Sequence, residues 1–169
     1  LFFDCFCIFS STVVALKGSD GVVMAVEKVV GSTLYEPGTN KRIFPIDRHV
    51  CASVAGILSD SRAIVERARE EARDYRSTYG RPIPLKYLKD RTSMYMHAYT
   101  LYSAVRPFGC AVALGSWDEA TGSELYCLEP SGVANGYKGF ALGKAKQSAK
   151  AEVEKLINVP KTARELIKE

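Results

Sequence analysis

The sequence changes from helical to strand periodicity at Arg106 and Pro107. Residues 108–114 form a short apolar run that ends at Gly115, which is typical of a strand inside a sheet. Proline cannot continue a helix and disfavours helical geometry at the preceding residue. The apolar residues before this point recur at helical spacing: Met94, Ala98, Leu101 and Val105. We therefore expect a helix over residues 85–105 that leads directly into a core strand.

Short apolar runs on both sides of this corner predict strands. We expect them over residues 12–17, 21–27, 42–46, 50–57, 108–117, 125–128 and 132–140. The first two are joined by a glycine-bearing turn and should form a hairpin. Because both are almost continuously apolar, both of their faces should be covered by other layers.

Helical periodicity marks three further segments. The first is expected to be capped by residues 59–61 and to extend to Tyr79, with its charged residues on a solvated face. The second covers residues 142–156, and the third begins at Thr162. The first segment has an apolar stripe that should face the core: Ile64, Ala68, Ala72, Tyr75 and Tyr79.

Several strands, two helices, several strands and two helices therefore follow one another. This order lacks the strict alternation of a doubly wound parallel sheet. It predicts an α+β fold with mostly antiparallel sheets. One arrangement is a four-layer sandwich, with two sheets face to face and a helix pair on each outer side. A chain of 169 residues is expected to form one domain.

Composition excludes several classes of protein. The net charge of +4 is spread among acidic residues, which argues against the one-signed patch of a nucleic-acid site. Five cysteines without a Cys-x-x-Cys pair favour buried reduced thiols over disulfides or zinc. No stretch is long and apolar enough to span a membrane, and residues 1–9 are too short to do so. No motif for a cofactor or a metal is present.

Few residues are candidates for chemistry. His49 and His97 have no serine, cysteine or carboxylate beside them in a catalytic pattern, so we interpret them as a surface turn residue and a packed helix residue. Cys110 lies within an apolar run, where burial makes a thiol a poor nucleophile. A serine or threonine at residues 10–12 could attack an amide if its own amine were free. The alternative is that these are residues at the start of a strand.

Several strings match, in order and spacing, those of proteasome α-type subunits. They are residues 11–16, 20–28, 40–44, 54–56, 69–72, 96–110, 130–132 and 142–145, together with Asp60. Residues 96–110 resemble the type-3 group of that family in particular. The resemblance covers residues 10–169, which we interpret as one partial α-subunit domain after an atypical segment at residues 1–9.

The resemblance implies the N-terminal-nucleophile hydrolase fold, an αββα sandwich with antiparallel sheets. It also implies a non-catalytic structural subunit of the α ring of the 20S proteasome core. Such a subunit contributes to assembly and to substrate and activator access in ubiquitin-dependent protein degradation, in the cytoplasm and the nucleus. The implied partners are neighbouring α subunits, β-ring subunits and regulatory-particle activators. No cofactor, nucleic acid or membrane is implied.

Comparison with β-type relatives implies that no catalytic residue is present. In those relatives the nucleophile is a processed N-terminal threonine, helped by an aspartate and a lysine. Alignment of the hairpins places Ser11, Glu27 and Arg42 at these three positions. All three are substituted, and arginine does not lose its proton at neutral pH.

Two binding surfaces are expected from the same resemblance. The pocket between neighbouring α subunits that receives activator C-termini usually has a lysine where Arg42 stands, and arginine can bind a carboxylate through two hydrogen bonds. The apolar surface around Tyr95, Tyr99 and Tyr102 is too broad for one core-facing stripe. Either this helix is buried within the fold, or it also contacts a β-ring partner.

Departures from the family pattern leave alternatives open. Residues 1–9 do not resemble the usual N-terminal extension, and the chain ends before the family's last helix and strands. The fold is therefore expected to be incomplete at the C-terminus, with an open sheet edge. The alternatives are an active N-terminal-nucleophile hydrolase, or a truncated product that does not assemble.

Overall fold

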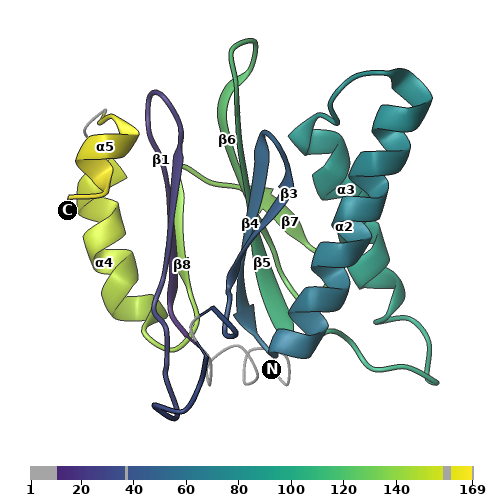
Figure 1. The fold of residues 1–169 in the computed structure, drawn as a ribbon, viewed down its shortest axis with the longest axis horizontal. Helices are drawn as coiled ribbons and strands as arrows, with labels where there is room; N and C mark the ends of the chain where they lie inside the picture. Colours follow the sequence, from purple (N-terminus) through teal and green to yellow (C-terminus); the bar gives the residue numbers. More distant parts are fainter. Residues whose placement is uncertain (1–10, 37, 158–160, 169) are drawn as a thin grey trace.

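Two antiparallel sheets lie face to face between two helical layers (Figure 1). The computed structural model describes residues 11–36, 38–157 and 161–168, so the interpretation of residues 1–9 lies outside the described residues. The elements are β1 (Val13–Lys17), β2 (Val22–Val26), β3 (Ile43–Asp47), β4 (Val50–Gly56), α2 (Leu58–Tyr79), α3 (Leu85–Ala98), β5 (Cys110–Asp118), β6 (Gly122–Leu128), β7 (Ala134–Gly136), β8 (Gly139–Leu142), α4 (Lys146–Ile157) and α5 (Ala163–Leu166). The expectation of mostly antiparallel sheets is confirmed.

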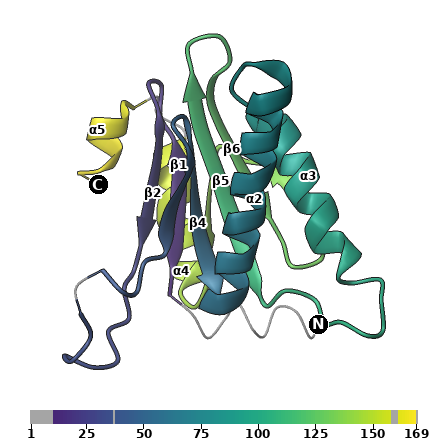
Figure 2. The ribbon, with the colours of Figure 1, turned by 45° about the vertical axis from the view of Figure 1, so that its right-hand side comes forward.

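One sheet has three strands in the order β2-β1-β8, and the other has five in the order β3-β4-β5-β6-β7. The hairpin expected at the start of the chain is present, with Val13 paired to Val26 and Lys17 to Val22. Its turn is closed by the Gly18 amide, which donates to the Gly21 carbonyl at 2.7 Å. Helices α2 and α3 cover the five-stranded sheet, and α4 and α5 cover the other (Figure 2).

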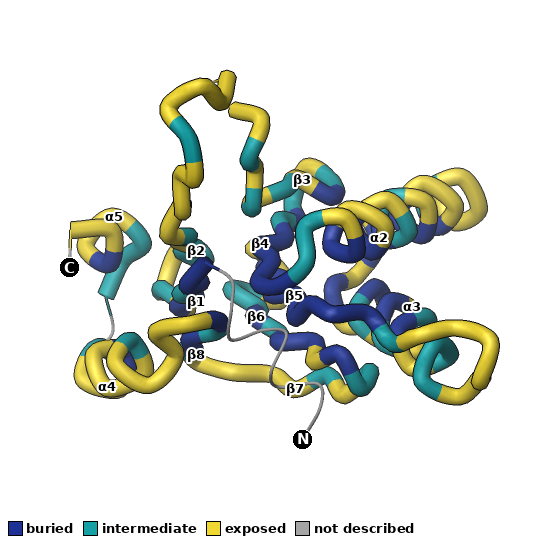
Figure 3. Tube along the Cα trace, turned by 90° about the horizontal axis from the view of Figure 1, so that it is seen from below, coloured by how far each residue is buried: buried dark blue, intermediate teal, exposed yellow. Residues whose placement is uncertain are grey.

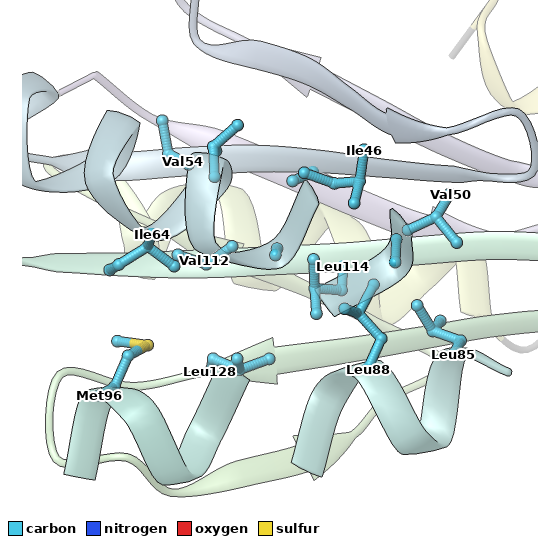
Figure 4. Close-up of a cluster of buried hydrophobic side chains, with 14 of the residues drawn as sticks. Ile46, Val50, Val54, Ile64, Leu85, Leu88, Met96, Val112, Leu114 and Leu128 are labelled. Atoms are coloured by element: carbon cyan, nitrogen blue, oxygen red, sulfur yellow. The ribbon is translucent and has the colours of Figure 1, made fainter. Parts of the chain in front are cut away.

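The largest core lies between α2, α3 and the five-stranded sheet (Figure 4). Apolar residues spaced three or four apart in α2 turn to the sheet, and Ile64, Ala68 and Ala72 are buried as expected. Leu88 and Met96 of α3 are fully buried beside them. Tyr79 is an exception, because it lies at the end of α2 with 58% of its surface exposed.

Helix α3 ends at Ala98, so the expectation of a helix up to residue 105 was wrong. The Thr100 hydroxyl donates to the His97 carbonyl at 2.7 Å, which satisfies a carbonyl at the helix end. The Tyr99 ring also packs on the Phe108 ring, with centroids 4.6 Å apart. The chain therefore turns back to β5 through an irregular segment instead of leading directly into it.

Other boundaries also differ from expectation; for example, β6 begins at Gly122 and not at Leu125. Helix α2 begins at Leu58 after Ile57, with no side-chain cap, so residues 59–61 lie inside the helix instead of capping it. The strand expected over residues 132–140 is two strands, β7 and β8, which belong to different sheets. Leu142 ends β8, and α4 begins four residues later at Lys146. The turn between β8 and α4 contains Gly143, which has a φ of +95°.

Burial refines two further expectations. Strand β2 is only half-buried because it is the edge strand of its sheet among the described residues, but both of its faces are covered: Val22 and Met24 pack against the other sheet, and Val23 packs against the helical layer. The charged face of α2 is not wholly solvated. Glu71 is buried, where it accepts hydrogen bonds from Arg67 and Arg91.

Thr162 caps α5 through a capping box with Glu165, which confirms the expected start of that helix.

Candidate functional site

A cavity of about 770 Å³ opens where β4 ends and α2 begins. Its other wall is the long connection between β2 and β3, which is mostly exposed (Figure 3). We call this cavity the Arg42 pocket. Its lining residues come from the start of the chain, this connection and the junction between β4 and α2: Ser11, Val29, Gly31, Leu34, Tyr35, Glu36, Thr39, Asn40, Arg42, Gly56, Ile57 and Leu58.

Arg42 immediately precedes β3 and supplies the positive charge of the pocket. Its Nη1 donates to the Gly56 carbonyl at 2.8 Å, while its Nε is buried without a hydrogen-bond partner among the described residues. Burial lowers the pKa of the Arg42 guanidinium from its usual value. An arginine nevertheless stays protonated at neutral pH. The pocket is therefore lined by a cation whose guanidinium is anchored to the Gly56 carbonyl.

The wall opposite the connection is formed by a glycine turn and a helix start. Gly56 has a φ of +123°, and a Cβ there would lie 2.6 Å from the Cα of Cys110 and overlap the Gly109 carbonyl. Only glycine fits this position without strain. Ile57 then precedes α2, a helix of 22 residues that begins at Leu58 with no side-chain cap. The first amides of α2 lack intrahelical partners and carry the positive end of the helix dipole, which also favours an anion.

A buried carboxylate holds this helix start. Asp60 accepts hydrogen bonds from Arg106 Nη1 at 2.7 Å and Nη2 at 2.9 Å, and from the Gly109 amide at 2.9 Å. Hydrogen bonding to Arg106 is the main reason that the pKa of Asp60 is lowered, against the opposing effect of burial. The carboxylate is therefore ionised and paired, and it binds the end of the 99–107 segment to α2.

The connection between β2 and β3 is fixed at two points. The Asn40 side-chain amide donates to the Val29 carbonyl at 3.3 Å, and Arg62 of α2 donates to the Thr39 carbonyl at 3.3 Å. Between these points it exposes apolar side chains. Leu34 is 91% exposed and Tyr35 is 58% exposed. The rim of the pocket thus offers apolar contact beside the charge of Arg42.

The three positions aligned with a catalytic triad make different contacts. Ser11 and Arg42 line the same pocket. Glu27 instead accepts a hydrogen bond from the Thr12 hydroxyl at 2.9 Å, and the same hydroxyl oxygen lies 3.3 Å from the Ala145 amide that donates to it. Thr12 therefore joins β1, the end of β2 and the start of α4.

Two of the three candidate interface tyrosines point inward. The Tyr95 and Tyr99 hydroxyls lie 3.2 Å apart, and both rings pack against Phe108 and the main core. Hydrogen bonding to Tyr99, followed by burial, raises the pKa of Tyr95 to about 12. Tyr102 is 67% exposed. Other apolar side chains of the same segment are also exposed: Met94, Leu101 and Val105. We call these three and Tyr102 the 94–105 patch.

The histidines and cysteines show no catalytic arrangement. His49 is partly buried, not a free surface residue, because its Nε2 lies 2.8 Å from the Ile83 carbonyl. His97 is exposed at the end of α3. Cys110 and Cys127 are buried as expected, whereas Cys51 is only partly buried, and burial raises the pKa of its thiol.

Residues 11–36, 38–157 and 161–168 hold neither a metal-binding cluster nor a membrane-spanning helix. No three His, Cys, Asp or Glu side chains lie where they could share a metal ion. None of the helices in these ranges combines the length and apolar character that a membrane crossing needs.

Comparison with known proteins gives the family of the chain. Residues 9–169 match the family described as "Proteasome subunit". The chain belongs to the proteasome subunit family. It is 50% identical over 160 residues to "Proteasome subunit alpha type-3" of Dictyostelium discoideum, covering 95% of this chain and 64% of that protein. It is 52% identical over 147 residues to the protein of the same name in Drosophila melanogaster, covering 87% of this chain and 58% of that protein.

One similar protein, from yeast, is named as an alpha type-7 subunit and not as an alpha type-3 subunit. The chain is 47% identical over 148 residues to "Probable proteasome subunit alpha type-7" of Saccharomyces cerevisiae, covering 88% of this chain and 51% of that protein. The resemblance to α-type proteasome subunits is thus confirmed. The chain spans about 60% of the length of the curated relatives it matches first.

Sequence reasoning found Arg42 but missed the residues that hold it. Gly56 is visible in the sequence only as a glycine between an apolar run and a helix. Asp60 was expected to cap α2, and Arg106 was read as a helix end. Their contact joins residues 46 positions apart, for which local periodicity carries no signal.

Proposed function

We propose that the protein is a non-catalytic structural subunit of the α ring of the 20S proteasome core. Family membership over residues 9–169 and the similarity to α-type subunits support this role. The ring would contribute to assembly and to substrate and activator access in ubiquitin-dependent protein degradation, in the cytoplasm and the nucleus. Its partners would be the neighbouring α subunits and the β-ring subunits.

We infer that the fold is the αββα sandwich of N-terminal-nucleophile hydrolases. The layers of Figure 1 have this order, and all sheet pairings among the described residues are antiparallel.

Absence of catalysis is supported by the chemistry of the triad positions. Arg42 cannot act as the base-tuning amine that a lysine provides, because its guanidinium stays protonated. The Thr12 hydroxyl is engaged with Glu27 and Ala145. The amine of Ser11 is bound in a peptide link to Ser10, so it cannot serve as a general base.

We further propose that the Arg42 pocket binds the C-terminal carboxylate of a regulatory-particle activator. The observation that carries this is the Arg42 guanidinium in the pocket lining, oriented by the Gly56 carbonyl, beside the uncapped start of α2. A guanidinium can give two parallel hydrogen bonds to a carboxylate. The exposed side chains of Leu34 and Tyr35 would contact the apolar residues that precede it.

The 94–105 patch is our candidate for contact with the β ring. Met94, Leu101 and Tyr102 are each at least 65% exposed, which is unusual for apolar side chains gathered in one segment. Tyr95 and Tyr99 would support this surface from below by packing on Phe108.

Native mass spectrometry after co-expression with the neighbouring α subunits tests the ring assignment. Incorporation into a ring-sized complex is expected. A chain that stays alone or aggregates would contradict it and favour a product that does not assemble. Arg42→Ala tests the pocket separately, since it should abolish the preference for a peptide carboxylate over its amide. Arg48→Ala, at a turn outside the pocket, should leave that preference unchanged.

A further inference from the structure

Two charged residues support the Arg42 pocket without lining it. We propose that Asp60 and Arg106 are positioning residues for this pocket. They hold the wall formed by Gly56 and Ile57, and through it the Arg42 guanidinium, in a geometry that accepts a carboxylate. This inference rests on the proposed function of the pocket and names how its geometry is set.

A continuous series of hydrogen bonds joins Arg106 to Arg42. Arg106 binds Asp60 with both terminal nitrogens, and Asp60 accepts from the Gly109 amide at 2.9 Å. The Gly109 carbonyl accepts from the Ile57 amide at 3.0 Å. The carbonyl of the preceding residue, Gly56, accepts from Arg42 Nη1 at 2.8 Å. Both the amide and the carbonyl of Gly109 are thus hydrogen-bonded to the start of α2.

The backbone segments at Gly56–Ile57 and Gly109–Cys110 are packed closely against each other. A Cβ on Gly56 would meet Cys110, and a Cβ on Gly109 would lie 2.7 Å from Cδ1 of Ile57. Two backbone segments packed this closely must move together, because protein interiors transmit small shifts instead of absorbing them. A displacement of Gly109 therefore moves the Gly56 carbonyl that orients Arg42.

Electrostatics add a reason for the pair. The side chain of Asp60 is only 10% exposed, and it lies two residues from Leu58, which lines the pocket. Without Arg106, this buried carboxylate would lose its countercharge. An uncompensated anion near the wall would repel an incoming carboxylate. Arg106 thus keeps the start of α2 favourable for an anion.

The chain offers a matched control in Arg91. It binds Glu71 through its Nε at 3.0 Å and its Nη2 at 3.1 Å, and the Glu71 side chain is also 10% exposed. This pair likewise joins α2 to a later segment, but neither residue lines the Arg42 pocket. The two arginines differ in which part of the fold they hold, and Glu71 also keeps Arg67 as a second partner.

Peptide binding to the assembled complex tests the proposal. The probe is a fluorescein-labelled Gly-Ser-Leu-Ala-Leu peptide with a free C-terminal carboxylate, compared with its amidated twin. Arg106→Gln should weaken binding of the carboxylate peptide about tenfold, the scale of one lost charge-assisted bond, and leave the amide unchanged. Arg106→Lys should retain part of the affinity, and Arg91→Gln should change it less than about twofold. Equal losses for Arg106→Gln and Arg91→Gln, for both peptides, or no loss at all, would overturn the proposal.

Hydrogen exchange in the complex without peptide separates this proposal from the pocket's function. Arg106→Gln should speed exchange at residues 55–60 and 107–110, whereas Arg91→Gln should not. Unchanged exchange in Arg106→Gln overturns the positioning role even if the wild-type pocket prefers the carboxylate. If the wild type shows no preference, the proposed function fails and the inference with it, while the exchange result still reports whether the wall is held.

Discussion

Helices α2 and α3 and helices α4 and α5 cover their sheets in very different ways. Beneath α2 and α3 lies a continuous core that includes the fully buried side chains of Ile64, Leu88 and Met96. Beneath α4 and α5 the buried cluster consists of Leu16, Val153 and Leu166. The first layer is therefore integral to the core, whereas the second rests on a small contact.

The charged residues of the two layers also differ in burial: those of α2 are buried and those of α4 are exposed. Asp60 and Glu71 of α2 are each less than a tenth exposed and bind arginines through several hydrogen bonds. In α4 the Glu152–Lys155 pair is 69% exposed on both sides. Removing one partner of a buried ion pair costs more than removing one partner of an exposed pair, because it leaves a buried charge without compensation. The layer that carries the main core thus also carries the buried ion pairs, and one of them, Asp60–Arg106, is at the helix start that lines the Arg42 pocket.

Truncation of core side chains should separate the two layers most clearly. Leu88→Ala is expected to lower the free energy of unfolding by about 3 kcal/mol, because it leaves a cavity among fully buried neighbours. Val153→Ala removes fewer carbons from a small cluster and should cost about 1–2 kcal/mol. Denaturant unfolding of both variants measures the difference. Equal costs would contradict the view that the layers differ.

Glycine substitution should show how closely the first layer is packed at its junction with the pocket. Gly56→Ala should lower the free energy of unfolding by about 2 kcal/mol, because the residue has a positive φ and no space for a Cβ. Gly80 at the end of α2 also has a positive φ, of +67°, but nothing lies within 4 Å of its Cβ position. Gly80→Ala should therefore cost only about 1 kcal/mol. If both variants unfold at the same denaturant concentration, packing at Gly56 adds nothing.

Local pattern was enough to predict the parts of the fold that local forces determine. The hairpin of β1 and β2, the buried face of α2 and the capping box at Thr162 all follow from spacing and residue type. The end of α3 did not follow. It depends on the packing of Tyr99 against Phe108, which lies beyond the helix, so the periodicity that continues to Val105 misled the prediction.

The same distinction applies to the site. Arg42 could be named from the family resemblance, but its environment is assembled from segments far apart in the chain. Asp60 and Arg106 meet only because β4, α2 and β5 lie side by side. The division of residues 134–142 between two sheets also depends on tertiary contacts, since β7 pairs with β6 in one sheet and β8 pairs with β1 in the other. Neither could be read from periodicity.

Acid should destabilise the first layer through its paired carboxylates. Hydrogen bonds from Arg106 and Arg91 lower the pKa values of Asp60 and Glu71 in the folded state. The unfolded chain therefore takes up these protons at a higher pH than the folded chain. The stability from these groups is complete above the ordinary carboxyl range of about pH 4, and it is lost as the pH falls through that range and the lowered folded values.

Denaturant midpoints measured at about pH 6 and about pH 3 check this pH dependence, since both values bracket the ordinary carboxyl range. The wild type should lose stability on acidification, and Asp60→Asn should lose less of it, because the substituted side chain no longer titrates. Glu152→Gln in α4 is the control and should keep the wild-type slope. If Glu152→Gln loses less stability on acidification than Asp60→Asn does, the acid-sensitive charges lie in α4, which would contradict this prediction.

The smallest effect is expected for the surface charges of the second layer. Lys155→Gln removes a pair whose nitrogen and oxygen lie 2.8 Å apart, but both side chains are 69% exposed. Water already solvates these charges, so the free energy of unfolding should change by less than about 0.5 kcal/mol. Lys150→Gln, which loses an equally exposed contact to Glu154, should behave alike. A loss above about 1 kcal/mol in either variant would mean that α4 is held by its charges as α2 is, and the contrast between the two layers would then be one of core size alone.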